Sequence, residues 1–135
     1  MRHLLVLVSV LSLLACTSLG DRQRDSKLDD ALSDYASAIR WGDFRRADDL
    51  RRLADPGQTS PSPDSLADVR VTSYRVIDKA KTASGDAADL DVSISFYIDE
   101  SMSVRTLRDH QHWSYDAPTS RWYITTPLPD FRSAR

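Results

Sequence analysis

The chain has 135 residues, of which 28% are charged and 41% hydrophobic, and its formal net charge is −2. A chain of this length forms one domain rather than two and can bury roughly two thirds of its surface, so a core is feasible although the single cysteine excludes an internal disulfide. The near-neutral charge argues against a nucleic-acid partner, because domains that bind nucleic acids are usually basic.

The N-terminal segment has the features of an export signal. Arg2 supplies a positive charge, and residues 4–14 are apolar apart from two serines. This run has about half of the ~20 residues that a membrane-spanning helix needs. A short apolar run that follows a basic residue and ends in small residues is typical of a cleaved signal peptide. Residues 1–15 are therefore predicted to be a lipoprotein signal peptide and to take no part in the fold.

The end of this run, Leu13-Leu14-Ala15-Cys16, resembles the bacterial lipobox, in which the cysteine directly follows the cleavage point. The resemblance implies that the thiol of Cys16 receives a diacylglyceryl group, that the signal is cut, and that the new amine is acylated. Three acyl chains would anchor the protein lastingly, since one chain gives only marginal membrane binding. Apart from this covalent lipid, no cofactor is expected. The alternative is an ordinary secretory signal that leaves a free thiol, which is unfavourable in an oxidising compartment.

The residue after the cysteine bears on the location of the protein. In enteric-type bacteria an aspartate at this place favours the inner membrane, and here the residue is Thr17. The expected location is therefore the cell envelope, at the periplasmic face of the outer membrane. Residues 16–25 are predicted to be a lipidated tether, because the segment from Thr17 to Asp25 is small and polar.

Two amphipathic helices are predicted to begin the single domain, residues 26–135. Ser26 can cap the first helix, and apolar residues at spacings of four, three and four give it one apolar face. Gly42 is expected to end it, and Asp43 can cap the second helix, which should end at Asp55-Pro56-Gly57. The apolar positions are Leu28, Leu32, Tyr35 and Ile39 in the first helix and Phe44, Ala47, Leu50 and Ala54 in the second.

Beyond a predicted loop at 58–65, the pattern changes to the alternation of β-strands. Strands are expected to start near Val69, to continue over 92–98 and 102–115, and to end with 122–126. The short connections between them favour an antiparallel meander. The predicted fold class is therefore α+β, with two N-terminal helices packed on a curved four-stranded antiparallel sheet.

This order of elements resembles the cystatin-like, or nuclear-transport-factor-two-like, superfamily. The resemblance is carried by the helix motif Ala38-Ile39-Arg40-Trp41-Gly42-Asp43-Phe44 and by the closing Trp113 and Trp122-Tyr123-Ile124. Members of this superfamily include enzymes with a pocket inside a cone and modules for binding or dimerisation. No catalytic residue of the superfamily can be transferred onto this sequence.

His110 and His112 are a candidate metal site. Residues two apart on a strand project from the same face, so the two imidazoles would lie about 6–7 Å apart. Zinc normally takes at least three protein ligands, and no further ligand motif accompanies the pair. We therefore predict that no metal binds and that both histidines lie on a polar strand face.

Aromatic residues on the last two strands form a candidate binding surface: Trp113, Tyr115, Trp122 and Tyr123. Adjacent strands can bring such rings into cross-strand contact. Core packing is the default interpretation, because large buried rings stabilise a fold strongly. A partner-binding surface uses the same residue types, here together with His110 and His112.

Charged residues cluster in two places, a predicted turn and the predicted second helix, and neither predicts catalysis. The two acidic pairs fall in a predicted turn and on a helix between arginines, so no apolar enclosure should raise their pKa. Arginines on the predicted second helix are spaced by four from aspartates and can form ion pairs; contact with acidic lipid or a cell-wall polymer is the alternative. The acidic pairs are Asp99-Glu100 and Asp48-Asp49, and the expected ion pairs are Arg45–Asp49 and Asp48–Arg52.

The sequence thus predicts a membrane-anchored periplasmic lipoprotein whose domain is not an enzyme and binds another envelope protein or a cell-wall component. The alternative is a domain that binds a small molecule, or acts on it, in a cone-shaped pocket. A deep polar cavity lined by Tyr97, His110 or His112 would favour that alternative. A filled core with exposed apolar side chains would favour the interaction domain.

Overall fold

The structure is a computed structural model that describes the backbone of residues 2–134 and the side chains of residues 19–134. The predicted lipidation site, Cys16, and the rest of the lipobox therefore lie outside the described side chains. Among the described residues, we find no helix with the length and apolar character that crossing a membrane requires.

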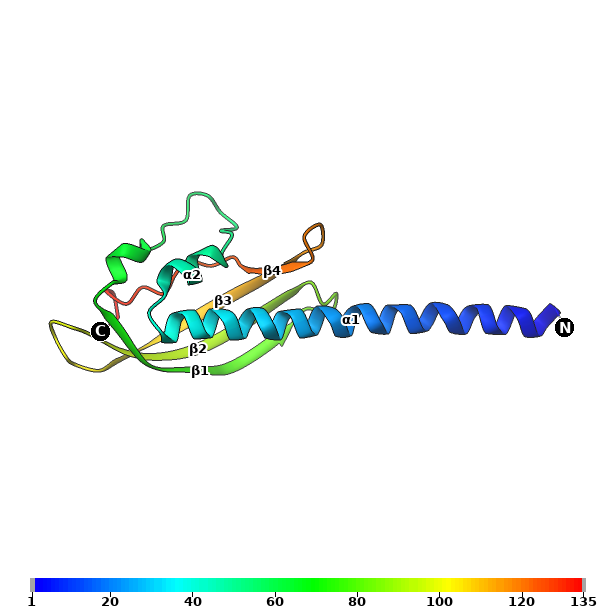
Figure 1. The fold of residues 1–135 in the computed structure, drawn as a ribbon, viewed down its shortest axis with the longest axis horizontal. Helices are drawn as coiled ribbons and strands as arrows, with labels where there is room; N and C mark the ends of the chain where they lie inside the picture. Colours follow the sequence, from blue (N-terminus) through cyan, green and yellow to red (C-terminus); the bar gives the residue numbers. More distant parts are fainter. Residues whose placement is uncertain (1, 135) are drawn as a thin grey trace.

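A long helix lies over one face of a four-stranded sheet (Figure 1). The strands form one antiparallel sheet in the order β1-β2-β3-β4, so each strand pairs with the next one in the chain. This confirms the predicted α+β class with N-terminal helices and an antiparallel meander. The elements are α1 (Arg2–Arg40), α2 (Phe44–Asp49), the 3-10 helix η1 (Pro63–Leu66), β1 (Val69–Lys81), β2 (Ala87–Ile98), β3 (Arg105–Asp116) and β4 (Arg121–Ile124).

The two faces of the sheet differ in polarity. Every second residue of β2 from Ala88 to Ile98 is buried, while the residues between them are partly or fully exposed. The buried face packs under α1, which contributes apolar side chains at the predicted helical spacing, including Leu28, Tyr35 and Ile39. Two register irregularities in β1, after Val71 and after Val76, add the bending that bulges produce.

Gly42 ends the first helix, as predicted. Its φ is +72°, a left-handed conformation that glycine adopts without steric cost. The amide of Gly42 donates to the carbonyl of Ile39, and that of Asp43 donates to the carbonyl of Ala38. These two bonds satisfy carbonyls that the helix end leaves open. Asp43 then caps α2 by accepting a hydrogen bond from the amide of Arg46.

The second helix is shorter than predicted, because the chain after Leu50 pairs with the end of β4. The amide of Arg52 donates to the carbonyl of Ile124, and the amide of Ile124 donates to the carbonyl of Leu50. The amide of Ala54 donates in turn to the carbonyl of Thr125. These tertiary bonds replace the helical ones that the sequence pattern predicts up to Ala54.

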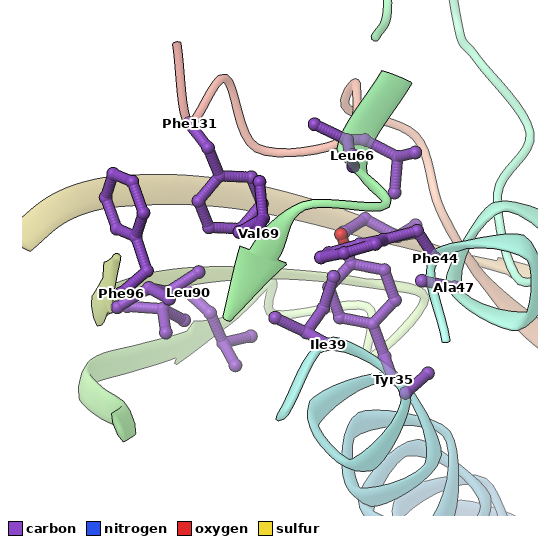
Figure 2. Packing of buried hydrophobic residues seen from close by; sticks show 14 of the residues in the cluster. Tyr35, Ile39, Phe44, Ala47, Leu66, Val69, Leu90, Phe96 and Phe131 are labelled. Atoms are coloured by element: carbon purple, nitrogen blue, oxygen red, sulfur yellow. The ribbon is translucent and has the colours of Figure 1, made fainter. Parts of the chain in front are cut away.

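The segment after β4 fills the interior of the fold. Leu128 is 2% exposed and Phe131 is fully buried, although the sequence pattern assigned neither to the core. The ring of Phe131 contacts those of Phe44 and Phe96, with centroids 5.6 and 4.9 Å apart (Figure 2). Arg132 fixes this segment through bonds to the Asp68 carboxylate at 2.7 Å and to a backbone carbonyl at 2.8 Å.

Candidate functional site

The four predicted aromatic residues do not form one surface, because they divide between the two faces of the sheet. Trp113 is fully buried, packs edge-on against Tyr35 at 5.7 Å, and belongs to the core. Trp122 is also buried, and Tyr115 is partly buried beside it, at 5.4 Å between ring centroids. Tyr123 faces the other way and stacks on the guanidinium of Arg52, 3.7 Å from its ring centroid.

Tyr115 and Trp122 hold the first helix from one side. The indole of Trp122 donates to the backbone carbonyl of Arg24 at 3.0 Å, and the guanidinium of Arg24 lies 4.7 Å from the centre of the Tyr115 ring. The ammonium of Lys27 donates to the carbonyl of Ser120 at 3.2 Å. A cation on an aromatic face and these hydrogen bonds fix α1 against the β3–β4 hairpin.

Two lysines of β1 hold the same helix from the other side. Lys79 forms an ion pair with Asp29 at 2.7 Å, and Lys81 forms one with Asp25 at 2.5 Å. We call Tyr115, Trp122, Lys79 and Lys81 the helix clamp. The helix clamp contacts α1 at Arg24, Asp25 and Asp29. Of these, Arg24 and Asp25 belong to the segment that the sequence predicted to be the tether.

The two predicted histidines lie on the outer face of the sheet opposite two aspartates. The Nδ1 atom of His110 lies 2.9 Å from Asp91, and that of His112 lies 2.7 Å from Asp89. The bond to Asp91 raises the pKa of His110. Among the described residues, no group of three or more His, Cys, Asp or Glu side chains is arranged to hold a metal ion.

The arginines near α2 have different partners from those predicted. Arg45 pairs with Asp64 at 2.7 Å and Arg52 pairs with Asp116 at 3.2 Å, not with the aspartates of α2. The predicted Asp48–Arg52 pair is wrong because α2 ends at Asp49, which leaves Arg52 beyond the helix. These pairs are largely exposed, so each contributes little to stability.

A buried acid on the inner face of β3 was not anticipated. Asp109 is 9% exposed, and Gln111 is fully buried beside it. The amide nitrogen of Gln111 donates to Asp109 at 2.7 Å and to the hydroxyl of Tyr74 at 2.9 Å, and its oxygen accepts from the indole of Trp113. Burial raises the pKa of Asp109 from 3.8 to about 6. The alternation could have revealed this acid, since residues two and four before a core tryptophan share its face.

Asp109 borders a cleft of about 600 Å³ between β3 and the segment after β4. Ser60, Thr126 and Leu128 also line it, together with Asp130 and with Arg132, whose guanidinium is paired with Asp68. An acid whose pKa is raised by burial next to a cleft is a candidate functional group. Neither predicted histidine faces the interior, but His110 reaches the rim of this cleft.

Replacing Asp109 with asparagine should stabilise the protein above pH 6. Because the folded pKa is raised, the contribution of this group to stability is fully present below pH 3.8 and is lost as the pH rises through 6. Asparagine keeps an oxygen for Gln111 and carries no charge, so we expect a gain of roughly 1–3 kcal/mol at pH 7.5 and little change at pH 4. Thermal unfolding of both forms at the two pH values measures this. The exposed Glu100→Gln variant is the control; a loss of stability at pH 7.5 would contradict the prediction.

Comparison with known proteins supports the fold. No protein-family model matches the sequence, and no curated protein matches it. Among solved structures, the chain is similar to a ketosteroid isomerase-like protein from Erwinia carotovora atroseptica SCRI1043. The superposition covers 75% of this chain and 90% of that chain, with a TM-score of 0.51 and 16% sequence identity. The fold is nuclear-transport-factor-two-like. The likeness agrees with the fold predicted from the order of the elements, and at this identity it concerns the fold alone.

Proposed function

We propose that the chain is a lipid-anchored envelope protein whose domain binds another protein or a cell-wall component and is not an enzyme. The supporting observation is the packing of the interior, where Phe131, Phe44 and Phe96 occupy the space between the helices and the sheet (Figure 2). Small-molecule sites are concave and largely preformed. A filled cone therefore favours recognition through the outer surface.

Exposed apolar side chains offer contacts for such a partner. Trp41 is 82% exposed at the end of α1, and Met102 and Val104 are 71% and 64% exposed in the β2–β3 hairpin. Tryptophan is enriched among the residues that contribute most to protein interfaces. Trp41 does not fill the core, so we propose it as a partner contact.

Crosslinking in intact cell envelopes tests this binding role. We expect the wild-type domain to capture a defined partner and the Trp41→Ala variant to lose it. The Leu19→Ala variant removes an apolar side chain that is 65% exposed elsewhere on α1, and it should keep the partner. Capture of nothing above background by the wild type would contradict the proposal.

The lipid anchor rests on Leu13-Leu14-Ala15-Cys16 and has its own test. Labelled palmitate should be incorporated into the wild-type protein and not into Cys16→Ala, because only the thiol of Cys16 can carry the diacylglyceryl group. Thr17→Ala leaves this thiol in place and should retain the label. An unlabelled wild type, with the protein free in the periplasmic fluid, would instead support the secretory signal with a free thiol.

A second candidate function is binding of a small molecule at the cleft beside Asp109. The observation that favours it is the buried carboxyl with a pKa of about 6, with Arg132 on the same cleft. A small basic or hydroxylated compound would suit this acid. Thermal stabilisation of the wild type by such a compound, absent in Asp109→Asn, would favour this candidate over the interaction domain.

A further inference from the structure

The direction in which α1 leaves the domain is fixed by the helix clamp. Contacts from Trp122, Tyr115, Lys79 and Lys81 reach Arg24, Asp25 and Asp29 from both sides of the helix. N-terminal to these contacts, the chain continues as the same helix. Figure 1 shows α1 projecting from the domain toward the N-terminus, and residues 16–23 of the projecting part remain after the predicted cleavage. The bond from the buried Trp122 to the carbonyl of Arg24 is the best shielded of these contacts, and together they set the direction of α1 from Arg24 onward.

The turns of the β1–β2 and β3–β4 hairpins lie at the end of the domain from which α1 projects. Both the β1–β2 and the β3–β4 turns point toward the N-terminal side, and the β2–β3 hairpin lies at the opposite end (Figure 1). The β1–β2 turn at 82–85 and Asp21 of α1 line one common cavity. Asp21 is five positions after Cys16, so this turn lies only about 8 Å along the helix from the predicted lipid site.

We infer that α1 is a rigid spacer that holds the β1–β2 hairpin against the lipid headgroups and directs the β2–β3 hairpin away from the membrane. The inference rests on the proposed lipidation of Cys16. An extended tether of eight residues, from Cys16 to Arg24, would span up to about 28 Å and would let the domain tumble. The helix shortens this separation to about 12 Å and fixes its direction.

The composition of the spacer and hairpin indicates surface contact rather than insertion. Between Thr17 and Asp25, Leu19 is the one large apolar residue, so this stretch lacks the apolar face that a helix needs to lie in the bilayer interface. The turn at 82–86 consists of Thr, Ala, Ser, Gly and Asp, which have no large apolar side chain to bury. This geometry leaves Met102 and Val104, at the far end, free to meet a partner in the periplasm.

Single-cysteine labelling tests the orientation. Lipidation consumes the thiol of Cys16, so Ala83→Cys and Ser103→Cys each place one reactive thiol, at the near and far hairpin respectively. The lipidated variants are labelled with a fluorophore and reconstituted into phosphatidylcholine vesicles that carry a nitroxide on the headgroup. We expect quenching to be several-fold stronger at position 83 than at position 103.

A flexible spacer is the matched control. Insertion of a Gly-Ser-Gly-Ser segment between Ser18 and Leu19 should bring the quenching at the two positions close together, because the helix no longer sets the orientation. Equal quenching with the native spacer, in protein that floats with the vesicles, would overturn the orientation and leave the anchor intact. Protein that does not float with the vesicles would overturn the anchor, and the orientation with it.

Discussion

The Trp113→Ala variant is expected to lose about 3–5 kcal/mol of its free energy of unfolding. Trp113 is fully buried, packs edge-on against Tyr35, and donates its indole hydrogen to Gln111. Truncation leaves a cavity and also leaves the oxygen of Gln111 without this donor. Since whole domains are stable by only 5–15 kcal/mol, the variant should be close to unfolding. Urea denaturation followed by circular dichroism measures the loss.

Trp41 provides a control of the same residue type. Its side chain is 82% exposed, so Trp41→Ala should change the free energy of unfolding by less than about 0.5 kcal/mol. The comparison separates the loss of a buried ring from the loss of a tryptophan as such. Similar losses in both variants would show that Trp113 is not the core residue that its burial indicates.

The spacing of apolar residues along the sequence correctly predicted the order of the helices and strands, and it predicted which faces of α1 and β2 are buried. The alternation from Val92 to Ile98 identified β2 and its buried face, and the spacing of Leu28, Tyr35 and Ile39 identified the face of α1 that packs on it. Turn residues between the strands predicted the meander. These features depend on periodicity within one element, which the sequence displays directly.

Features that depend on contacts between distant segments were not predicted. α2 ends early because Leu50 and Arg52 bond to β4, more than 70 positions later in the chain. The helix continues through the predicted tether, where the clamp holds Arg24 and Asp25. A polar segment such as 17–25 carries no apolar face that would indicate a helix. Its conformation follows from residues elsewhere.

In the candidate site, too, the local features were predicted and the contacts between distant residues were not. The histidines were expected to share a polar strand face, and they do, but their pairing with Asp89 and Asp91 depends on the register of β2 and β3. Asp109 lies between two polar neighbours in the sequence, Arg108 and His110, so it has no local sign of burial. Its burial follows from the side of the strand that Trp113 occupies.

The Phe131→Ala variant is expected to lose about 3–5 kcal/mol and to gain an apolar cavity. Phe131 is fully buried between Phe44 and Phe96, so its removal leaves a space lined by two aromatic rings. The segment should stay in place, because Arg132 remains bonded to Asp68 and Leu128 remains buried. Urea denaturation measures the loss, and the exposed Met102→Ala variant should show almost none.

The same variant also tests whether the interior of the native domain is filled. An apolar cavity made by truncation stays dry and can bind benzene. Benzene should therefore raise the melting temperature of Phe131→Ala and leave that of the wild type unchanged. Equal stabilisation of the wild type would mean that a ligand-sized space already exists beside Phe131, which would contradict the filled interior on which the interaction domain rests. Stabilisation of the variant alone means that the side chain of Phe131 fills the space between the helices and the sheet in the native domain, so a ligand would have to bind outside this space, at the outer surface or in the cleft beside Asp109.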